Sequence, residues 1–251
     1  MYRQRNAGSA PARSNGDAAL IAEPTDLHVW LATLGVIWFE LTVVGRPAYV
    51  GQAGAYVNAI EKACDVVVAL RAIPEELNRA FSHPLFPSGA KPLTLNIGRI
   101  HGGDWASNVP LECTITGRMS FPIDWPVERA QRLLEERVAQ HAASDPWLAD
   151  HPPAIHYPGF RAAGWQADPD QPLLQLLDQV VRAVVGEPLT RTVFAGTADA
   201  RYFGPSGGVV FFGPAGGHQH APDEYLDLDS FVAAARIIAL LMAEWCSQER
   251  Q

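Results

Sequence analysis

The chain has 251 residues, of which 48% are hydrophobic and 18% charged, a balance typical of a globular protein with ample material for a core. Its formal net charge of −8 argues against binding nucleic acid or an anionic membrane, since both require a basic face. The three cysteines are far apart and show no metal-ligand spacing, which fits a reducing compartment. The N-terminus has no apolar signal core, and no apolar run is judged long enough to span a membrane. We therefore expect a cytoplasmic protein.

Residues 1–16 are polar, hold no periodic pattern and are expected to be disordered. Order is predicted to begin at Asp17, with a short apolar strand that ends in Glu23-Pro24-Thr25. A second apolar stretch, residues 28–34, follows it. A first strand that ends in a carboxylate and a proline, with nothing folded before it, is unusual for the start of a domain.

Residues 36–159 follow the order strand, helix, strand, strand, helix, strand. The first strand, residues 36–44, alternates and is rich in β-branched side chains, and residues 54–70 have the three-and-four spacing of an amphipathic helix. The other predicted elements here are strands at 92–100, 109–121 and 154–157 and a helix at 126–143. This order is the ferredoxin-like (βαββαβ) pattern.

The last third of the chain has a different order of predicted helices and strands. A helix is predicted at 172–185, an extended segment at 190–195, a short buried strand at 208–212 and a long helix at 228–245. Strands alternating with helices indicate a parallel or mixed sheet, so the fold class is α/β. The βαββαβ unit is thus predicted to be inserted into another domain, of which only the two flanks are present.

A glycine-rich turn joins the strand at 208–212 to the closing helix. It contains Gly216-Gly217, two histidines, His218 and His220, and the acidic pair Asp223-Glu224. Ligands commonly bind at strand ends of this kind, and neutral imidazole is a common metal ligand. The alternative is a polar loop whose histidines are solvated.

Five short blocks occur in one order along the chain. They are Ala22-Glu23-Pro24-Thr25; Gly45-Arg46-Pro47-Ala48 with Gly54 and Asn58-Ala59-Ile60; Gly102-Gly103 with Asn108-Val109-Pro110; Gly196-Thr197-Ala198-Asp199-Ala200-Arg201; and Gly213-Pro214 with His220-Ala221-Pro222-Asp223-Glu224-Tyr225. Together they resemble the dinuclear-zinc amidohydrolase family of acetylornithine deacetylase, succinyl-diaminopimelate desuccinylase, aminoacylase and glutamate carboxypeptidase. The resemblance runs from about Asp17 to Trp245.

The resemblance implies a partial zinc-hydrolase catalytic domain, made of residues 17–35 and 160–251, with residues 36–159 as an inserted dimerisation (lid) domain. It also implies two zinc ions in the complete family site, with cobalt as a possible replacement. The implied partners are an N-acyl amino acid or small peptide and a second copy of the chain, bound through the lid.

Two residues match metal ligands of the family. Glu23 resembles the carboxylate that binds one zinc, and His220 resembles the imidazole that binds the other. Zinc sites use this mixture of carboxylate oxygen and imidazole nitrogen. His218 is assigned only as a neighbour, because the Pro-Asp-Glu-Tyr sequence of the family follows His220.

Arg201 and Asn108 are candidates for holding the carboxylate or amide of the substrate. A guanidinium offers a fork of donors that matches a carboxylate. Each residue also has a structural alternative: Arg201 could pair with Asp199, and Asn108 could tie down its own turn. Arg118, where the family often has arginine, is assigned a structural role.

Two departures from the family pattern stand out. Tyr49 occupies the position of the lid histidine that, in relatives, reaches the oxyanion across the dimer; a phenol donates a hydrogen bond but cannot carry a positive charge at neutral pH. The chain also has no His-x-Asp motif, and its adjacent glutamates, Glu75-Glu76 and Glu135-Glu136, lie on predicted lid helices. The general base of the family is therefore not matched.

Two functions follow from these matches and departures. The first is a metal-dependent hydrolase of amide bonds, truncated or split so that most of its ligands lie elsewhere. The second is a non-catalytic dimerising or amino-acid-binding module derived from that family. Tyr49 favours the second, whereas Glu23 and His220 favour the first, because a dimerising module has no evident need for them.

Overall fold

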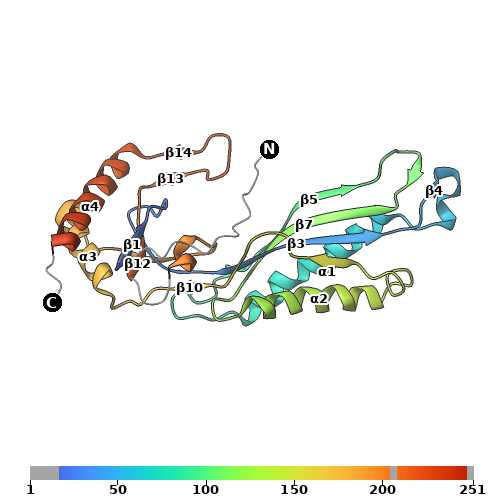
Figure 1. Ribbon diagram of the computed structural model, residues 1–251, viewed down its shortest axis with the longest axis horizontal. Coiled ribbons are helices and arrows are strands. Elements are labelled where there is room, and N and C mark those ends of the chain that lie inside the picture. The colour runs from blue at the N-terminus through green and yellow to red at the C-terminus, as the bar shows by residue number, and fades with distance from the viewer. Residues whose placement is uncertain (1–16, 204–207, 248–251) are drawn as a thin grey trace.

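The computed structural model describes residues 17–203 and 208–247 (Figure 1). The start that was predicted to be disordered, residues 1–16, lies outside them. The described chain forms two larger sheets, each with its own pair of helices, arranged end to end in an elongated molecule (Figure 1). Two small two-stranded sheets extend from these lobes.

One lobe has the predicted ferredoxin-like arrangement. Its elements are β3 (Gly35–Val44), α1 (Ala59–Ala80), β5 (Leu95–Gly102), β7 (Glu112–Phe121), α2 (Val127–Ala143) and β8 (Ala154–His156). The strands are all antiparallel and lie in the order β5-β7-β3-β8. A short strand, β9 (Arg161–Ala162), also pairs with β3. Both helices cover the same side of the sheet (Figure 1).

The core of this lobe follows from the apolar periods of its elements. Alternate residues of β3, such as Ile37, Phe39 and Leu41, are fully buried, as the two-residue period of a strand requires. The buried residues of α1 recur at intervals of three and four: Ala59, Ala63, Val66, Leu70 and Ile73. The sheet face and the helix stripe thus close on one hydrophobic core.

The first lid helix differs from its prediction at both ends. Residues 50–55 form a separate 3-10 helix, and α1 begins at Ala59, because the Asn58 side chain caps it by accepting a hydrogen bond from the Ile60 N–H at 2.9 Å. The helix was predicted to end at residue 70, yet α1 continues past Pro74 to Ala80. Ile73, which precedes the proline, is fully buried, and this packing holds the helix through it.

The other lobe holds a mixed sheet. Its strands are β1 (Ala18–Ile21), β2 (Val29–Thr33), β10 (Trp165–Gln166), β11 (Arg191–Phe194) and β12 (Gly208–Phe211). β1 and β12 are parallel, as are β11 and β2, whereas β12 and β10 run antiparallel to β2. The helices α3 (Pro172–Val185) and α4 (Leu228–Ser247) pack against each other and against one face of this sheet.

Two adjacent segments join the lobes. On the outward path, only the buried Leu34 separates β2 from β3. On the return path, residues 163–164 separate β9 from β10. Because β9 pairs with β3 and β10 pairs with β2, the two paths run side by side.

The closing helix contradicts one expectation from the sequence. Leu228–Ser247 has 20 residues and a mean hydropathy of 1.5, so by length and composition it could cross a membrane; among the described residues it is the one helix that meets this criterion. The expectation that no apolar run reaches such a length is therefore wrong. One side of α4, with Ala234, Ile237 and Leu241, is buried in the hydrophobic core.

Candidate metal-hydrolase site

Parallel pairing brings the turn that carries Glu23 next to residues 213–214, which lead into the loop that carries His220. β1 and β12 are in register, with Ile21 opposite Phe211, so the turns that follow them leave from the same edge of the sheet. The first turn then bonds to the second through the backbone. The Leu27 N–H donates to the Gly213 carbonyl at 2.9 Å, and the Asp26 N–H donates to the Pro214 carbonyl at 3.2 Å.

Thr25 ties the two turns together through its side chain. Its hydroxyl oxygen accepts a hydrogen bond from the Gly213 N–H at 2.9 Å and donates to the His28 carbonyl at 2.7 Å. The residue is only 2% exposed, so losing either bond would leave a buried polar group unpaired. Gly213 is needed for the same contact, since a Cβ there would lie 2.3 Å from the Glu23 carbonyl oxygen.

Backbone strain concentrates in the same two turns. Four non-glycine residues in the described chain have positive φ: Asp26 at 60°, Leu27 at 57°, His218 at 57° and His220 at 68°. A side chain in this region costs on the order of 1–3 kcal/mol and persists where the surrounding structure holds it. Asp26 and Leu27 lie in the turn bonded to residues 213–214, and His218 and His220 lie in the loop beyond Gly217. The strain thus marks both segments as a candidate site without reference to any family.

Glu23 occupies an unfavourable environment for a negative charge. Partial burial raises the pKa of its carboxyl, and the nearby carboxylate of Asp199 raises that pKa further. Asp199 begins the short 3-10 helix η2 (Asp199–Tyr202), where Ala200 is fully buried in the cluster that contains Trp30.

Replacing Glu23 by glutamine is expected to stabilise the chain at pH 7 by up to about 1 kcal/mol. Because the folded pKa of Glu23 lies above its ordinary value of 4.5, ionisation of this carboxyl favours the unfolded state as the pH rises through that range. The gain should therefore be present at pH 7 and disappear well below pH 4.5. Urea unfolding at both pH values measures it, with Glu75→Gln on an exposed part of α1 as control. Destabilisation by Glu23→Gln at pH 7 would contradict a raised pKa of the Glu23 carboxyl in the folded chain.

Contacts among residues 218–225 fix the second turn. His218 Nδ1 lies 2.7 Å from Asp223 Oδ2, and the His218 ring meets that of Tyr225 edge-on, with 5.6 Å between centroids. The backbone N–H of His220 donates to the Glu224 carboxylate at 3.3 Å. The His220 side chain is exposed, so the turn holds its backbone and leaves its ring accessible.

The described residues do not hold a complete metal site. Within 17–203 and 208–247, no group of three or more His, Cys, Asp or Glu side chains is arranged to hold a metal ion. The paired glutamates of the lid serve structural contacts: Glu76 pairs with Arg137, and Glu135 accepts a hydrogen bond from Tyr157. Glu23 and His220 therefore fit only part of a ligand set, since zinc sites use about four.

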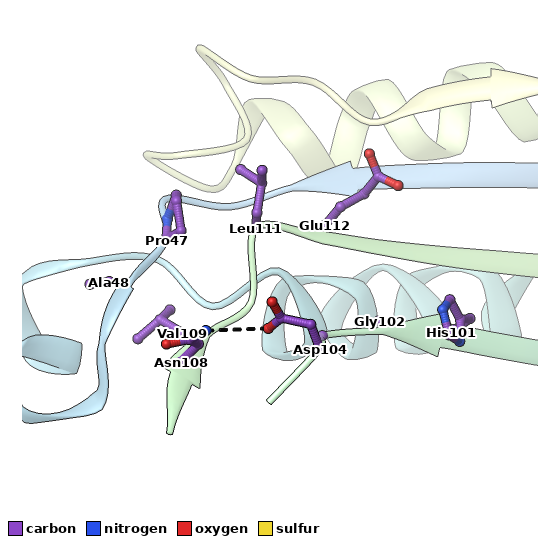
Figure 2. Close-up of a pocket in the computed structure, with 10 residues that line it drawn as sticks. Pro47, Ala48, His101, Gly102, Asp104, Asn108, Val109, Leu111 and Glu112 are labelled. Atoms are coloured by element: carbon purple, nitrogen blue, oxygen red, sulfur yellow. Dashed lines mark hydrogen bonds between the residues drawn. The ribbon is translucent and has the colours of Figure 1, made fainter. Parts of the chain in front are cut away.

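Tyr49 and Asn108 meet at the tip of the lid, a pairing that the sequence did not predict. They lie directly opposite each other on the two-stranded sheet of β4 (Ala48–Tyr49) and β6 (Asn108–Val109). The Asn108 amide donates to Asp104 Oδ1 at 3.4 Å, as its structural alternative required (Figure 2). The Tyr49 side chain is exposed.

A pocket of about 570 Å³ opens beside this pair (Figure 2). Asp104 and Asn108 line one part of it, and His101 and Glu112 also contribute. His101 was not identified from the sequence, because nothing in the strand pattern of residues 92–100 marks the residue after it as part of a pocket.

The lid tip does not reach the paired turns within one chain. β4 lies at the far end of the ferredoxin-like lobe, whereas the hairpin of β13 (Gly216–Gly217) and β14 (Tyr225–Leu226) extends from the other lobe (Figure 1). Tyr49 and Asn108 are thus not brought together with Glu23 and His220.

The remaining candidates are two arginines. Arg201 lies in η2, but its side chain is outside the described part of the structure, so the choice between substrate binding and a pair with Asp199 stays open. Arg118 Nη1 donates to Thr94 Oγ1 at 3.3 Å, which agrees with a structural role.

Comparison with known proteins identifies the lid. Residues 31–146 match the peptidase dimerisation domain family. The acetylornithine deacetylase of Erwinia tasmaniensis is 28% identical over 235 residues, which cover 92% of this chain and 57% of that enzyme. The N-formyl-4-amino-5-aminomethyl-2-methylpyrimidine deformylase of Halalkalibacterium halodurans is 25% identical over 206 residues, 78% of this chain and 47% of that enzyme. The chain thus spans about half the length of the curated relatives it matches.

Solved structures share the fold. A tripeptidase from Staphylococcus aureus has a TM-score of 0.69 at 14% identity over 93% of this chain and 58% of its own. A metallo-carboxypeptidase of the M20 family from Sulfolobus solfataricus has a TM-score of 0.63 at 14% identity over 90% of this chain and 61% of its own.

The mixed sheet with an inserted ferredoxin-like domain is the architecture of metallopeptidases and amidohydrolases of this type. The dimerisation-domain match and these relatives support the M20 family of zinc amidohydrolases and exopeptidases, which the five sequence blocks indicated.

Proposed function

We propose that this chain supplies one part of a site for metal-dependent hydrolysis of amide bonds in N-acyl amino acids or small peptides. The observation that supports the proposal is the backbone pairing of the turn after Glu23 with residues 213–214. The four positive-φ non-glycine residues of the described chain lie in that turn and in the loop that carries His220. Relatives named as a deacetylase, a deformylase and a tripeptidase support an amide-cleaving reaction.

In this proposal Glu23 and His220 are metal ligands. Two zinc ions, or cobalt in their place, would supply Lewis-acid polarisation and a lowered pKa for water when bound. Arg201 and Asn108 are proposed to hold the carboxylate or amide of the substrate. The general base and the remaining ligands are not matched by any residue of the described chain, and in this proposal further polypeptide would supply them.

In this proposal each lobe corresponds to one domain of the enzyme. Residues 17–35 and 160–251 would belong to the catalytic domain, and residues 36–159 would form the lid. The two adjacent connections, through Leu34 and through residues 163–164, support a lid that is attached at one place.

We propose that the lid forms a homodimer through β5 and α1, which contact each other. β5 is the edge strand of the lid sheet, and Ile100 on it and Val68 on α1 are 52% and 70% exposed. Unpaired edges and exposed apolar side chains favour association.

Val68→Glu is therefore expected to convert a dimer of 27.2 kDa chains into monomers in light scattering. Val185→Glu, at an exposed position on α3, should leave the dimer intact. A monomeric unmodified chain at high concentration would refute the proposal.

A non-catalytic dimerising or amino-acid-binding module remains the second candidate function. Tyr49 favours it, since this exposed phenol at the lid tip occupies the position of a histidine and cannot supply a positive charge at neutral pH.

The proposed hydrolase function is tested with a hybrid in which the amino-terminal part of the Erwinia tasmaniensis acetylornithine deacetylase precedes Asp17. We expect slow, zinc-dependent release of acetate from N-acetylornithine. Glu23→Ala in the hybrid should lower kcat/KM at least about 100-fold, because it removes a ligand whose loss disables the metal centre. Glu75→Ala should have no effect. A folded hybrid that hydrolyses no N-acyl amino acid or peptide would favour the non-catalytic module.

A further inference from the structure

His218 is held by two side chains although it lies on the surface. Its Nδ1 lies 2.7 Å from Asp223 Oδ2, and its ring meets the Tyr225 ring edge-on, with 5.6 Å between centroids. A carboxylate only accepts hydrogen bonds, so the ring N–H is the donor. The side chains of His218 and Asp223 are 58% and 71% exposed, so burial in a core does not enforce their contact. We call His218, Asp223 and Tyr225 the His218 brace.

The backbone around the brace is built to allow it. Gly217 pairs with Tyr225 across β13 and β14, and a Cβ on Gly217 would lie 2.7 Å from the Tyr225 ring. The glycine therefore leaves room for the tyrosine ring beside His218. His218 itself has a φ of 57°, a strained conformation that persists only where surrounding contacts hold it. The hydrogen bond to Asp223 and the contact with Tyr225 are two such contacts.

The brace closes the loop that contains His220. The His218 carbonyl accepts a hydrogen bond from the Ala221 N–H at 2.8 Å, and the Ala221 carbonyl accepts one from the Glu224 N–H at 3.2 Å. The side-chain bond from His218 to Asp223 spans the same segment, so His220 lies between its two ends. His220 also has a positive φ, 68°. Fixing both ends of this short segment restricts the directions available to the His220 ring.

We propose that His218 is a positioning residue, which acts through Asp223 to orient the His220 imidazole for metal binding. This inference rests on the proposed function, in which His220 is a metal ligand. A ligand that is oriented before the ion arrives loses less conformational freedom on binding, so its orientation contributes to affinity. Hydrogen-bonding partners that orient metal ligands typically contribute about 10- to 100-fold in metal affinity.

Two other roles account for fewer of these observations. A solvated loop histidine would explain neither the positive φ nor the two side-chain contacts. A ligand role for His218 itself would need further ligating side chains around it, and residues 17–203 and 208–247 present no group of three that could hold a metal ion.

Amide hydrogen exchange in the metal-free, full-length chain tests the brace. His218→Ala and Asp223→Ala are each expected to speed exchange of the Ala221 N–H at least about threefold, because each removes the bond that holds the loop closed. The double variant should exchange no faster than either single variant, since both changes remove the same bond. His156→Ala, at an exposed position of the lid, should have no effect. Additive effects of the two changes, or none, would overturn the proposal.

Cobalt titration of the hybrid, followed by visible absorption, tests the positioning of His220. His218→Ala should weaken cobalt binding at least about tenfold. His218→Asn should restore most of that affinity, because asparagine tolerates a positive φ and its amide can donate to Asp223. His218→Gly relieves the backbone strain but has no donor, so it should bind no better than the alanine variant.

The same titration separates this inference from the proposed function. Equal losses in His218→Ala and His218→Asn would identify His218 as a ligand and overturn its positioning role. Full affinity in His218→Ala, in a hybrid that His220→Ala weakens, would overturn the positioning role alone. A hybrid that binds no cobalt, or binds it equally well with His220→Ala, would overturn the proposed function.

Discussion

Tyr49→His is expected to raise kcat of the hybrid for N-acetylornithine about 100-fold. The resemblance places position 49 where a lid histidine donates to the oxyanion, and removing one such donor typically costs about 100- to 1,000-fold in kcat. A tyrosine hydroxyl can also donate one hydrogen bond, so the gain should fall at the lower end of that range. The side chain is exposed on β4 beside Asn108, so a histidine fits without disturbing the core.

The control for this change is Trp105→His, which places a histidine at another exposed position of the lid tip. It should leave kcat unchanged. If Tyr49→His has no effect in an active hybrid, the role assigned to position 49 is wrong, and the assignments of Glu23 and His220 stand.

Gly213→Ala is expected to destabilise the chain by about 2–4 kcal/mol and to separate the two turns of the site. The new Cβ would lie 2.3 Å from the Glu23 carbonyl oxygen. Because that atom is backbone, no side-chain rotation relieves the clash, and the Gly213 N–H would be pushed away from the buried Thr25 hydroxyl.

Urea unfolding of the chain measures this loss. Gly54→Ala is the matched control, since nothing lies within 4 Å of a Cβ at that position. A Gly213→Ala variant that unfolds within about 0.5 kcal/mol of the unmodified chain would show that the turns tolerate separation.

The lid was predictable from the sequence because its local signals agree with one another. The two-residue period of residues 36–44 and the helical period of residues 54–70 each bury a single face, and together they specify the βαββαβ order. The errors lie where one residue competes with the periodic pattern. Asn58 starts α1 later than its apolar spacing indicates, and the buried Ile73 carries the helix past Pro74.

The candidate site was predictable only in part. Sequence blocks predicted Glu23 and His220 as ligands, but the contact between the segments that lead to them depends on the parallel register of β1 and β12, which pairs residues 190 positions apart. The periodicity of neighbouring residues does not predict that strand pairing. The cross-strand position of Tyr49 and Asn108 is likewise a tertiary feature, which appears only when the neighbouring elements are placed.

We propose that this chain provides two ligands of a hydrolase site and no complete catalytic centre. Hydrolysis of N-acetyl amino acids by the unmodified 251-residue chain, with zinc added, tests it most directly. We expect no turnover above the uncatalysed rate, because the described residues hold no group of three metal ligands and no matched base. Zinc-dependent turnover by the unmodified chain that Glu23→Ala abolishes would contradict it.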